Sequence, residues 1–328
     1  MPDEYVLHGA PISLFTRKLE AALRFYGAPF RMETKAGPQA AGIESRSGTH
    51  QVPVLETPEN WMIADTTPLI ALLDARFPAR RLVPEGPLGV LVHVVEEVLD
   101  EWVARVMVHY RWHYDENTRH VVGNILGKSV SLEQARAFPV AQWGLRACRA
   151  TGTDAEAQRA AAEREYAGLL SALEAQLGGT RFALGDRPTA VDAILLGGLR
   201  AHVNNDPLPQ LDRWPRCVAW DEKEADRWDG SGDLAPFPAS TPFADHVLAL
   251  ARDAYLPFVL GNAQALADGE RSFVADTYGE PVSYLARPYP ERSRQMVVEH
   301  IRDRLDDAGR AAVGAWLEKR GLAQAFMP

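Results

Sequence analysis

The sequence predicts an α/β domain, an all-helical domain and then a C-terminal extension of helices with a β-hairpin. In the first 80 residues, short β-prone runs and helical patterns follow one another in the order βαβ and then ββα. From residue 88 to about 230, apolar residues recur at helical steps only. A stretch rich in glycine and proline near residue 230 marks the start of the extension. With 328 residues, 46% of them hydrophobic, the chain is long enough for two or three folded units.

The first domain is expected over residues 1–80, with four strands and flanking helices. Its elements are, in order, a strand at 5–8, a helix at 13–27, strands at 29–35, 51–56 and 61–63, and a helix that begins at 65–68. The first helix is predicted from the apolar stripe of Leu19, Leu23 and Tyr26, and Gly27 ends it.

The second domain is expected over residues 88–229, after a linker at 78–87 that is rich in proline and arginine. Helical spacing of apolar residues from Val95 to His113 predicts a long helix. The run Thr153-Asp154-Ala155-Glu156 is interpreted as a capping box that opens another helix. Thr189-Ala190-Val191-Asp192 opens a third helix, which is apolar on nearly every side and is therefore expected in the domain centre.

The extension is expected over residues 230–328. Its predicted elements are a helix over about 243–267, a hairpin with strands at 273–278 and 282–287, and helices from about residues 291 and 308.

Composition narrows the classes of partner. The formal net charge of −9 disfavours nucleic acid, because phosphate neutralisation needs a basic surface. The sequence contains no apolar run long enough to span a bilayer, and its acidic start differs from a signal peptide, so a cytoplasmic protein that does not bind membranes is expected. Cys148 and Cys217 form neither a CxxC motif nor a disulfide framework. A small-molecule partner fits this composition.

Three motifs in the first domain occur in a characteristic order. They are Ser13-Leu14-Phe15-Thr16-Arg17-Lys18, then Gln51-Val52-Pro53-Val54-Leu55, and then Asp65-Thr66 at the start of a helix that ends near Arg76-Phe77-Pro78. Together they resemble the glutathione-binding domain of the glutathione transferase family, with Leu14 where the family has proline. The resemblance implies a thioredoxin-like fold with a mixed four-stranded sheet, glutathione as co-substrate, and a homodimer.

The resemblance gives Ser13 the catalytic role. A free thiol of this kind has a pKa of about 8.5, so glutathione needs stabilisation of its thiolate at neutral pH. A hydroxyl at a helix N-terminus supplies it through a hydrogen bond and the helix dipole. Taken alone, Ser13 would be a plain helix cap. Arg17 either adds positive potential or forms a surface ion pair.

The other two motifs are expected to hold the ends of glutathione. Pro53 is expected to be cis, so that the backbone of Val52 pairs with the cysteinyl unit. Asp65 would bind the α-ammonium group, and Thr66 the α-carboxylate, at a helix N-terminus that suits anions. His50 and Gln51 either reach the glycine end or are solvated loop residues.

In the second domain, Thr189 and Asp192 follow Gly185-Asp186-Arg187-Pro188, which is similar to a structural signature of the family. The resemblance also places the run Tyr110-Arg111-Trp112-His113-Tyr114 beside the thiol, where these residues either contact a hydrophobic co-substrate or pack the domain interface. His109 and His113 share a helical face, but no third ligand is evident and no metal is expected.

The leading hypothesis is a glutathione transferase that attacks a small hydrophobic electrophile. The 10–18 loop lacks cysteine, which disfavours a glutaredoxin-like reductase. The alternatives are a glutathione-dependent isomerase and a non-catalytic binding or scaffold protein. The extension could cover the electrophile pocket, restrict substrate size or replace part of the dimer contact.

Overall fold

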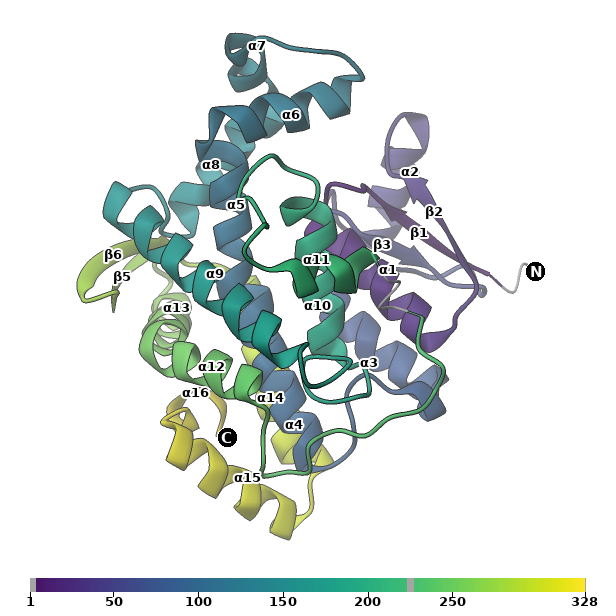
Figure 1. The fold of residues 1–328 in the computed structure, drawn as a ribbon, viewed down its shortest axis with the longest axis vertical. Helices are drawn as coiled ribbons and strands as arrows, with labels where there is room; N and C mark the ends of the chain where they lie inside the picture. The colour runs from purple at the N-terminus through teal and green to yellow at the C-terminus, as the bar shows by residue number, and fades with distance from the viewer. Residues whose placement is uncertain (1–3, 223–226, 328) are drawn as a thin grey trace.

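A computed structural model describes residues 4–222 and 227–327 (Figure 1). The expectation about the acidic N-terminus rests on residues 1–3 as well, and these lie outside the described residues.

The first domain is built on a mixed four-stranded sheet. Its strands are β1 (Tyr5–Gly9), β2 (Phe30–Thr34), β3 (Val54–Glu56) and β4 (Met62–Ala64), in the order β2-β1-β3-β4. Strands β1 and β2 are parallel and the other pairs are antiparallel. Val54 pairs with His8 on one side and Ala64 on the other. The start of β3 therefore lies beside the ends of β1 and β4, and the predicted sheet is confirmed.

Helix α1 (Leu14–Tyr26) is enclosed between the sheet and the second domain (Figure 1). It ends at Gly27, whose φ of 67° is a left-handed conformation that glycine adopts without steric cost. The predicted helix that begins at 65–68 is α3 (Thr66–Arg76), and it packs against α1. Helix α2 (Pro38–Ser47) was not predicted, because Ile43 is its buried residue and its other side chains form no apolar stripe.

The second domain is helical. The predicted long helix consists of α4 (Pro87–Glu97), a π-helical turn η2 (Val98–Val103) and α5 (Ala104–His113). The remaining helices are α6 (Asp115–Leu126), α7 (Leu132–Ala137), α8 (Pro139–Ala150), α9 (Glu156–Gln176), α10 (Ala190–Gly198) with its π-helical end η3 (Leu199–Val203), and α11 (Pro215–Glu222).

The capping box predicted at Thr153 is wrong. The N-cap position of the following helix is Ala155, two residues beyond Thr153, whose hydroxyl donates to the carbonyl of Cys148 in the preceding helix. Helix α9 begins at Glu156, and the backbone amide of Ala155 donates to the Gln158 side chain at 3.4 Å.

The capping box at the start of α10 is confirmed. Asp192 is fully buried and accepts hydrogen bonds from the amides of Thr189 at 2.7 Å and Ala183 at 2.8 Å. Burial raises the pKa of Asp192 to about 6. This helix packs against α1, so the cap lies where the two domains meet.

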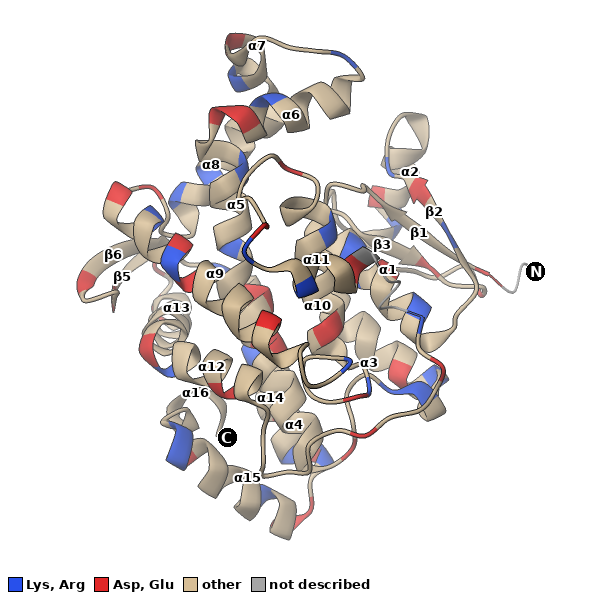
Figure 2. Cartoon of the chain, viewed as in Figure 1, with Lys and Arg blue, Asp and Glu red and all other residues tan. Residues whose placement is uncertain are grey.

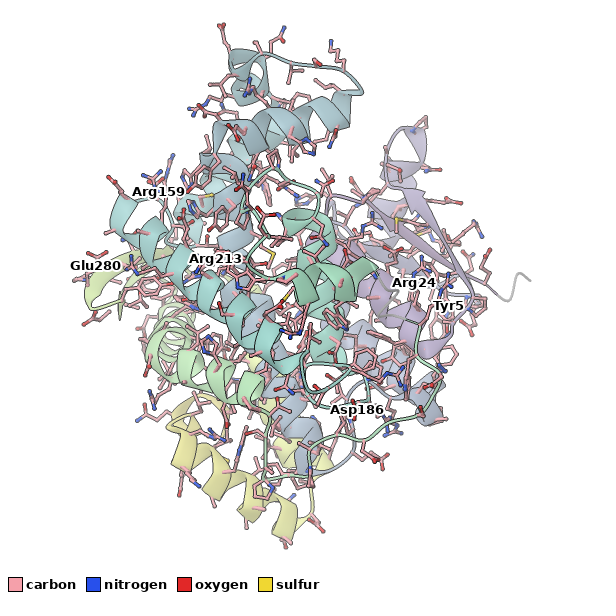
Figure 3. The ribbon with its side chains drawn as sticks, viewed as in Figure 1. Tyr5, Arg24, Arg159, Asp186, Arg213 and Glu280 are labelled. Atoms are coloured by element: carbon pink, nitrogen blue, oxygen red, sulfur yellow. The ribbon has the colours of Figure 1, made fainter. Side chains whose placement is uncertain are left out.

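The extension packs along the second domain. Its first segment pairs with the loop before α10, where the Asp186 amide donates to the Asp233 carbonyl at 2.8 Å. Figure 3 labels Asp186 in this loop. Its elements are α12 (Pro242–Leu250), η4 (Ala251–Tyr255), α13 (Leu256–Ala267), β5 (Ser272–Thr277), β6 (Glu280–Leu285), α14 (Pro288–Arg304), α15 (Asp307–Arg320) and α16 (Ala323–Phe326). The predicted helices and hairpin are present, and the short α16 is additional.

The hairpin turn has positive φ values at Tyr278 (60°) and Gly279 (75°), as a two-residue turn with matching strand twist requires. Its Tyr284 packs edge to face on Phe258 of α13 and lies near Trp102. The buried side chains of the extension therefore continue the core of the second domain.

Acidic and basic residues are interspersed over the elements (Figure 2). In the described part of the chain, no helix is long and apolar enough to cross a bilayer.

Candidate functional site

The loop between β1 and α1 places Ser13 at the N-terminus of α1. Ser13 is partly buried, and its Oγ accepts a hydrogen bond from the Thr16 amide at 3.3 Å. The Thr16 hydroxyl accepts from the Ala10 amide at 3.2 Å and supports the loop. A Cβ atom at Gly9 would lie 2.4 Å from Thr16, so this approach requires glycine. Since a hydroxyl both accepts and donates, the Ser13 proton remains available to a ligand.

Arg17 is directed to the protein surface beside this loop. Its Nε donates to the Pro11 carbonyl at 3.0 Å, and a second nitrogen contacts Glu20 at 2.6 Å. Of the two alternatives for Arg17, these contacts fit the ion pair.

The peptide bond between Val52 and Pro53 is cis, as expected. Pro53 is buried and leads into β3, while Val52 is partly buried. His50 and Gln51 are exposed in the preceding loop, and Lys35 donates to the Gln51 carbonyl at 2.9 Å.

Asp65 is the N-cap residue of α3 and has an unusual backbone. Its φ of 75° lies in a region that residues other than glycine seldom occupy, and such strain is concentrated at functional sites. The Asp65 carboxylate accepts from the Thr67 amide at 3.3 Å and binds Arg292 of α14. Thr66 is buried in the first turn of the helix, where amides lack intrahelical partners.

The sheet register brings these three motifs to one end of the sheet. Ser13 follows β1, Val52 and Pro53 precede β3, and Asp65 follows β4. Because these strand ends are paired neighbours, the three motifs lie close together at one end of the sheet.

The long helix contacts the loop before Ser13. Arg111 donates to the Ile12 carbonyl at 2.6 Å, and Val108 packs in the same apolar cluster as Ile12. Glu101, Ala104 and Val108 are partly exposed on a helix that is otherwise mostly buried. The motifs found in the sequence did not single out these three residues. Their spacing of three and four residues could have indicated that they share one face of the helix.

Arg111 and Trp112 are interior packing residues. Arg111 is buried and binds both carboxylate oxygens of Asp206, at 2.8 and 3.0 Å. Trp112 packs so closely on α8 that a Cβ atom at Gly144 would lie 2.3 Å from its indole nitrogen. For these two residues the packing alternative applies.

Tyr110, His113 and Tyr114 lie on the side of the long helix that faces α9. Tyr110 and Tyr114 are stacked, with ring centroids 5.5 Å apart. The Tyr114 hydroxyl donates to Glu163 at 2.7 Å, and His109 contacts the same carboxylate at 2.8 Å. Burial is the main cause that lowers the pKa of His113 to about 4, and the neighbouring His109 adds to the effect. The His113 imidazole is therefore neutral at pH 7. Within residues 4–222 and 227–327, no group of three or more His, Cys, Asp or Glu side chains is arranged to hold a metal ion.

Two parts of the chain match a known family. Residues 7–81 match the family described as glutathione S-transferase, N-terminal domain, and residues 156–229 match glutathione S-transferase, C-terminal domain. In these two segments the chain belongs to the glutathione transferase family. A comparison with curated proteins finds no match.

Several solved structures are similar to this member of the glutathione transferase family. A glutathione S-transferase from Rhodospirillum rubrum F11 has 14% identity and a TM-score of 0.48, covering 74% of this chain and 99% of that chain. One from Methylobacterium radiotolerans, in complex with glutathione sulfonate, has 20% identity and a TM-score of 0.45, covering 72% and 98%. A β-etherase from a Sphingobium strain has 15% identity and a TM-score of 0.48, covering 68% and 97%.

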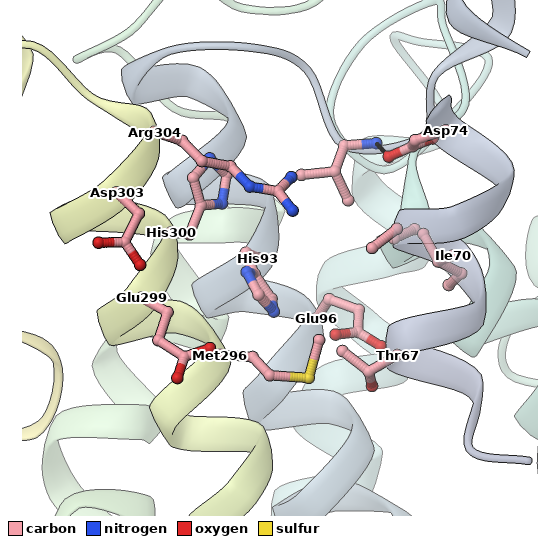
Figure 4. A pocket seen from close by; sticks show the side chains of 13 residues that line it. Thr67, Ile70, Asp74, His93, Glu96, Met296, Glu299, His300, Asp303 and Arg304 are labelled. Atoms are coloured by element: carbon pink, nitrogen blue, oxygen red, sulfur yellow. Dashed lines mark hydrogen bonds between the residues drawn. The ribbon is translucent and has the colours of Figure 1, made fainter. Parts of the chain in front are cut away.

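This glutathione transferase family member also has a cavity of about 330 Å³ between α3, α4 and α14 (Figure 4). The side chains of His93, His300 and Arg304 line it, together with Thr67, which lies two residues beyond Asp65. Both ring nitrogens of His93 are buried without a hydrogen-bond partner among the described residues. Burial lowers the pKa of both histidines to about 4. The cavity adjoins the start of α3, whereas Ser13 lies outside its lining.

A buried acidic cluster joins α1 to the long helix in this family member. Lys18 contacts Glu96 and Asp100, each at 2.5 Å. Burial raises the pKa of Asp100 to about 7 against the opposing effect of Lys18, because one ammonium group cannot neutralise two carboxylates. Glu101 is partly exposed, and its loss of hydration, followed by the charge of Asp100, raises the pKa of Glu101 to about 8.

The raised pKa of Glu101 predicts a pH-dependent stability. An unfolded glutamate has a pKa of about 4.3, so between that value and about 8 the folded chain binds the proton more tightly. This contribution to the free energy of unfolding is present at low pH and is lost as pH rises through about 8. The stability advantage of Glu101→Gln over the wild type should therefore grow between pH 5 and pH 8.5 in denaturant titrations. An advantage that stays constant over this pH range would contradict this prediction, and Glu270→Gln, at an exposed glutamate, is the matched control for the substitution itself.

Proposed function

We propose that this protein is a glutathione transferase that activates the glutathione thiol at Ser13 for attack on a small hydrophobic electrophile. The observation that carries the proposal is the placement of Ser13, the cis Val52–Pro53 bond and the strained Asp65 at neighbouring strand ends. Membership of the glutathione transferase family supports the choice of ligand.

Each motif then has a role toward glutathione. The Ser13 hydroxyl donates to the sulfur, and the backbone of Val52 pairs with the cysteinyl unit. Asp65 holds the α-ammonium group, while Thr66 holds the α-carboxylate at the helix N-terminus. His50 and Gln51, which are exposed, are assigned to the glycine end.

The chemistry needs little beyond a stabilised thiolate. Loss of the thiol proton to solvent gives an anion that Ser13 and the N-terminal dipole of α1 favour over the thiol. The sulfur lone pair forms a bond to the electrophilic carbon as a leaving group departs or an activated double bond accepts the electron pair. We assign the apolar wall of the electrophile pocket to Ile12 and Val108, which pack in one apolar cluster, and Arg111 fixes the Ile12 backbone through its carbonyl.

The domain division at 1–80, 88–229 and 230–328, a cytoplasmic location and a homodimer are parts of the same proposal. They follow from the family resemblance and from the linker composition at residues 78–87.

A binding and turnover assay tests the proposal. The wild-type protein is expected to be retained on immobilised glutathione and to conjugate glutathione to members of a panel of activated double bonds, halides and aryl ethers. Retention without turnover across the panel would favour the scaffold alternative. Rearrangement of an unsaturated ketone without net consumption of glutathione would favour the isomerase. Failure to bind glutathione would contradict the transferase, the isomerase and the glutathione-binding scaffold alike.

A further inference from the structure

The first turns of α14, in the C-terminal extension, reach the γ-glutamyl end of the proposed glutathione site. Arg292 binds the carboxylate of Asp65. Its side chain is 57% exposed, so guanidinium N–H groups that do not contact Asp65 remain open to a ligand. The Arg292 guanidinium also lies 5.0 Å from the ring centre of Tyr289, which supports its position.

A second arginine of the extension faces the same region. Arg287 is the N-cap residue of α14 and interacts electrostatically with Glu101. Its Nε atom is buried and has no hydrogen-bond partner among residues 4–222 and 227–327. Arg287 and Arg292 are therefore cations near the start of α14, and each has guanidinium N–H groups without a hydrogen-bond partner among the contacts described.

The charge of this region indicates what these arginines do. Asp65 interacts electrostatically with Asp100 and Glu101, so three carboxyl groups gather here. Glutathione itself carries two carboxylates and one ammonium group at neutral pH, which gives it a net negative charge. Such an anion would be repelled by the acidic cluster unless cations stood beside it.

We propose that Arg292 binds the α-carboxylate of the γ-glutamyl residue of glutathione, while Asp65 holds the adjacent α-ammonium group. This inference rests on the proposed function. Asp65 can serve both partners, because each carboxylate oxygen has two lone pairs and the known contacts are with Thr67 and Arg292. Arg287 adds positive potential beside Glu101. The extension is then part of the glutathione site.

Calorimetric titration with three ligands tests this assignment. The ligands are glutathione, γ-aminobutyryl-cysteinylglycine, which lacks the α-carboxylate, and glutaryl-cysteinylglycine, which lacks the α-ammonium group. In Arg292→Ala the Kd for glutathione should rise at least about tenfold, and the Kd for glutaryl-cysteinylglycine should rise similarly, because a charge-assisted hydrogen bond is lost. The Kd for γ-aminobutyryl-cysteinylglycine should stay at its wild-type value. Arg302→Ala is the matched control, since Arg302 is an exposed arginine of the same helix that pairs with its neighbour Asp303.

The possible outcomes separate this assignment from the proposed function. Unchanged or tighter binding of glutathione by Arg292→Ala, with normal wild-type binding, overturns the Arg292 assignment alone. An equal loss for γ-aminobutyryl-cysteinylglycine also overturns it, because Arg292 would then act only by positioning Asp65. Failure of the wild type to bind glutathione contradicts the proposed function itself and removes the basis of the assignment. Thermal unfolding of each variant checks that it is folded.

Discussion

Replacement of Lys18 by methionine is expected to lower the free energy of unfolding by about 3–5 kcal/mol, the cost of leaving buried charges without their partner. Lys18 is fully buried, and its ammonium group bridges Glu96 and Asp100 across the contact between α1 and the long helix. Burial lowers the pKa of this lysine, but the Asp100 and Glu96 carboxylates outweigh it and raise the pKa above its usual value. The group is therefore a fixed positive charge, and its loss leaves two carboxylates facing each other.

Guanidinium denaturation at pH 8 measures this loss. The exposed control Lys319→Met should change stability by less than about 0.5 kcal/mol. A triple variant that also carries Glu96→Gln and Asp100→Asn should recover much of the stability, because it removes the uncompensated charges. A loss below about 1 kcal/mol in Lys18→Met would show that this ion cluster does not couple the two domains.

Ser13→Ala is expected to lower kcat/KM for conjugation by about 10²-fold, the usual cost of losing one preorganised donor to a developing or stabilised anion. Glutathione should still bind, because Val52, Asp65 and Thr66 hold the rest of the tripeptide. Ser13→Thr keeps a hydroxyl at the same helix start and should retain most of the activity. Steady-state kinetics with the best electrophile of the panel provide the measurement.

The helix-capping role of Ser13 requires a separate control. Its Oγ accepts from the Thr16 amide, so Ser13→Ala also removes a cap worth about 0.5–2 kcal/mol. Ser131→Ala removes an equivalent cap from α7, far along the chain, and should leave kcat/KM unchanged. If Ser13→Ala conjugates glutathione at the wild-type rate, Ser13 caps helix α1 and does not activate the thiol.

The sequence was sufficient to predict the parts of the site that lie in short, regular elements. Strand and turn patterns predicted β1, β3 and the start of α3, and the family motifs predicted the cis bond before Pro53. The strands and the helix start depend on neighbouring residues, so local chemistry determines them, whereas the cis bond followed from the family resemblance. Helix α2 was missed because its exposed residues carry no apolar periodicity.

The residues that were missed in the site come from segments far apart in the chain. Arg292 reaches Asp65 because α14 of the extension packs along α4. No sequence pattern near either residue predicts that contact. Arg111 and Trp112 were grouped with a pocket by their place in the sequence, yet both side chains are buried inside the protein. The predicted capping box at Thr153 failed because the helix begins later, with Ala155 as its N-cap, and Thr153 instead donates to the end of α8.

The central claim is that the sulfur of glutathione lies beside the Ser13 hydroxyl and is held there as a thiolate. Ultraviolet titration of the thiolate in the glutathione complex measures this directly. In the wild type, the pKa of the bound thiol is expected to lie at least about one unit below the free value of about 8.5, and to return toward that value in Ser13→Ala. An unshifted thiol in the wild type, or the same lowered pKa in both proteins, would contradict it.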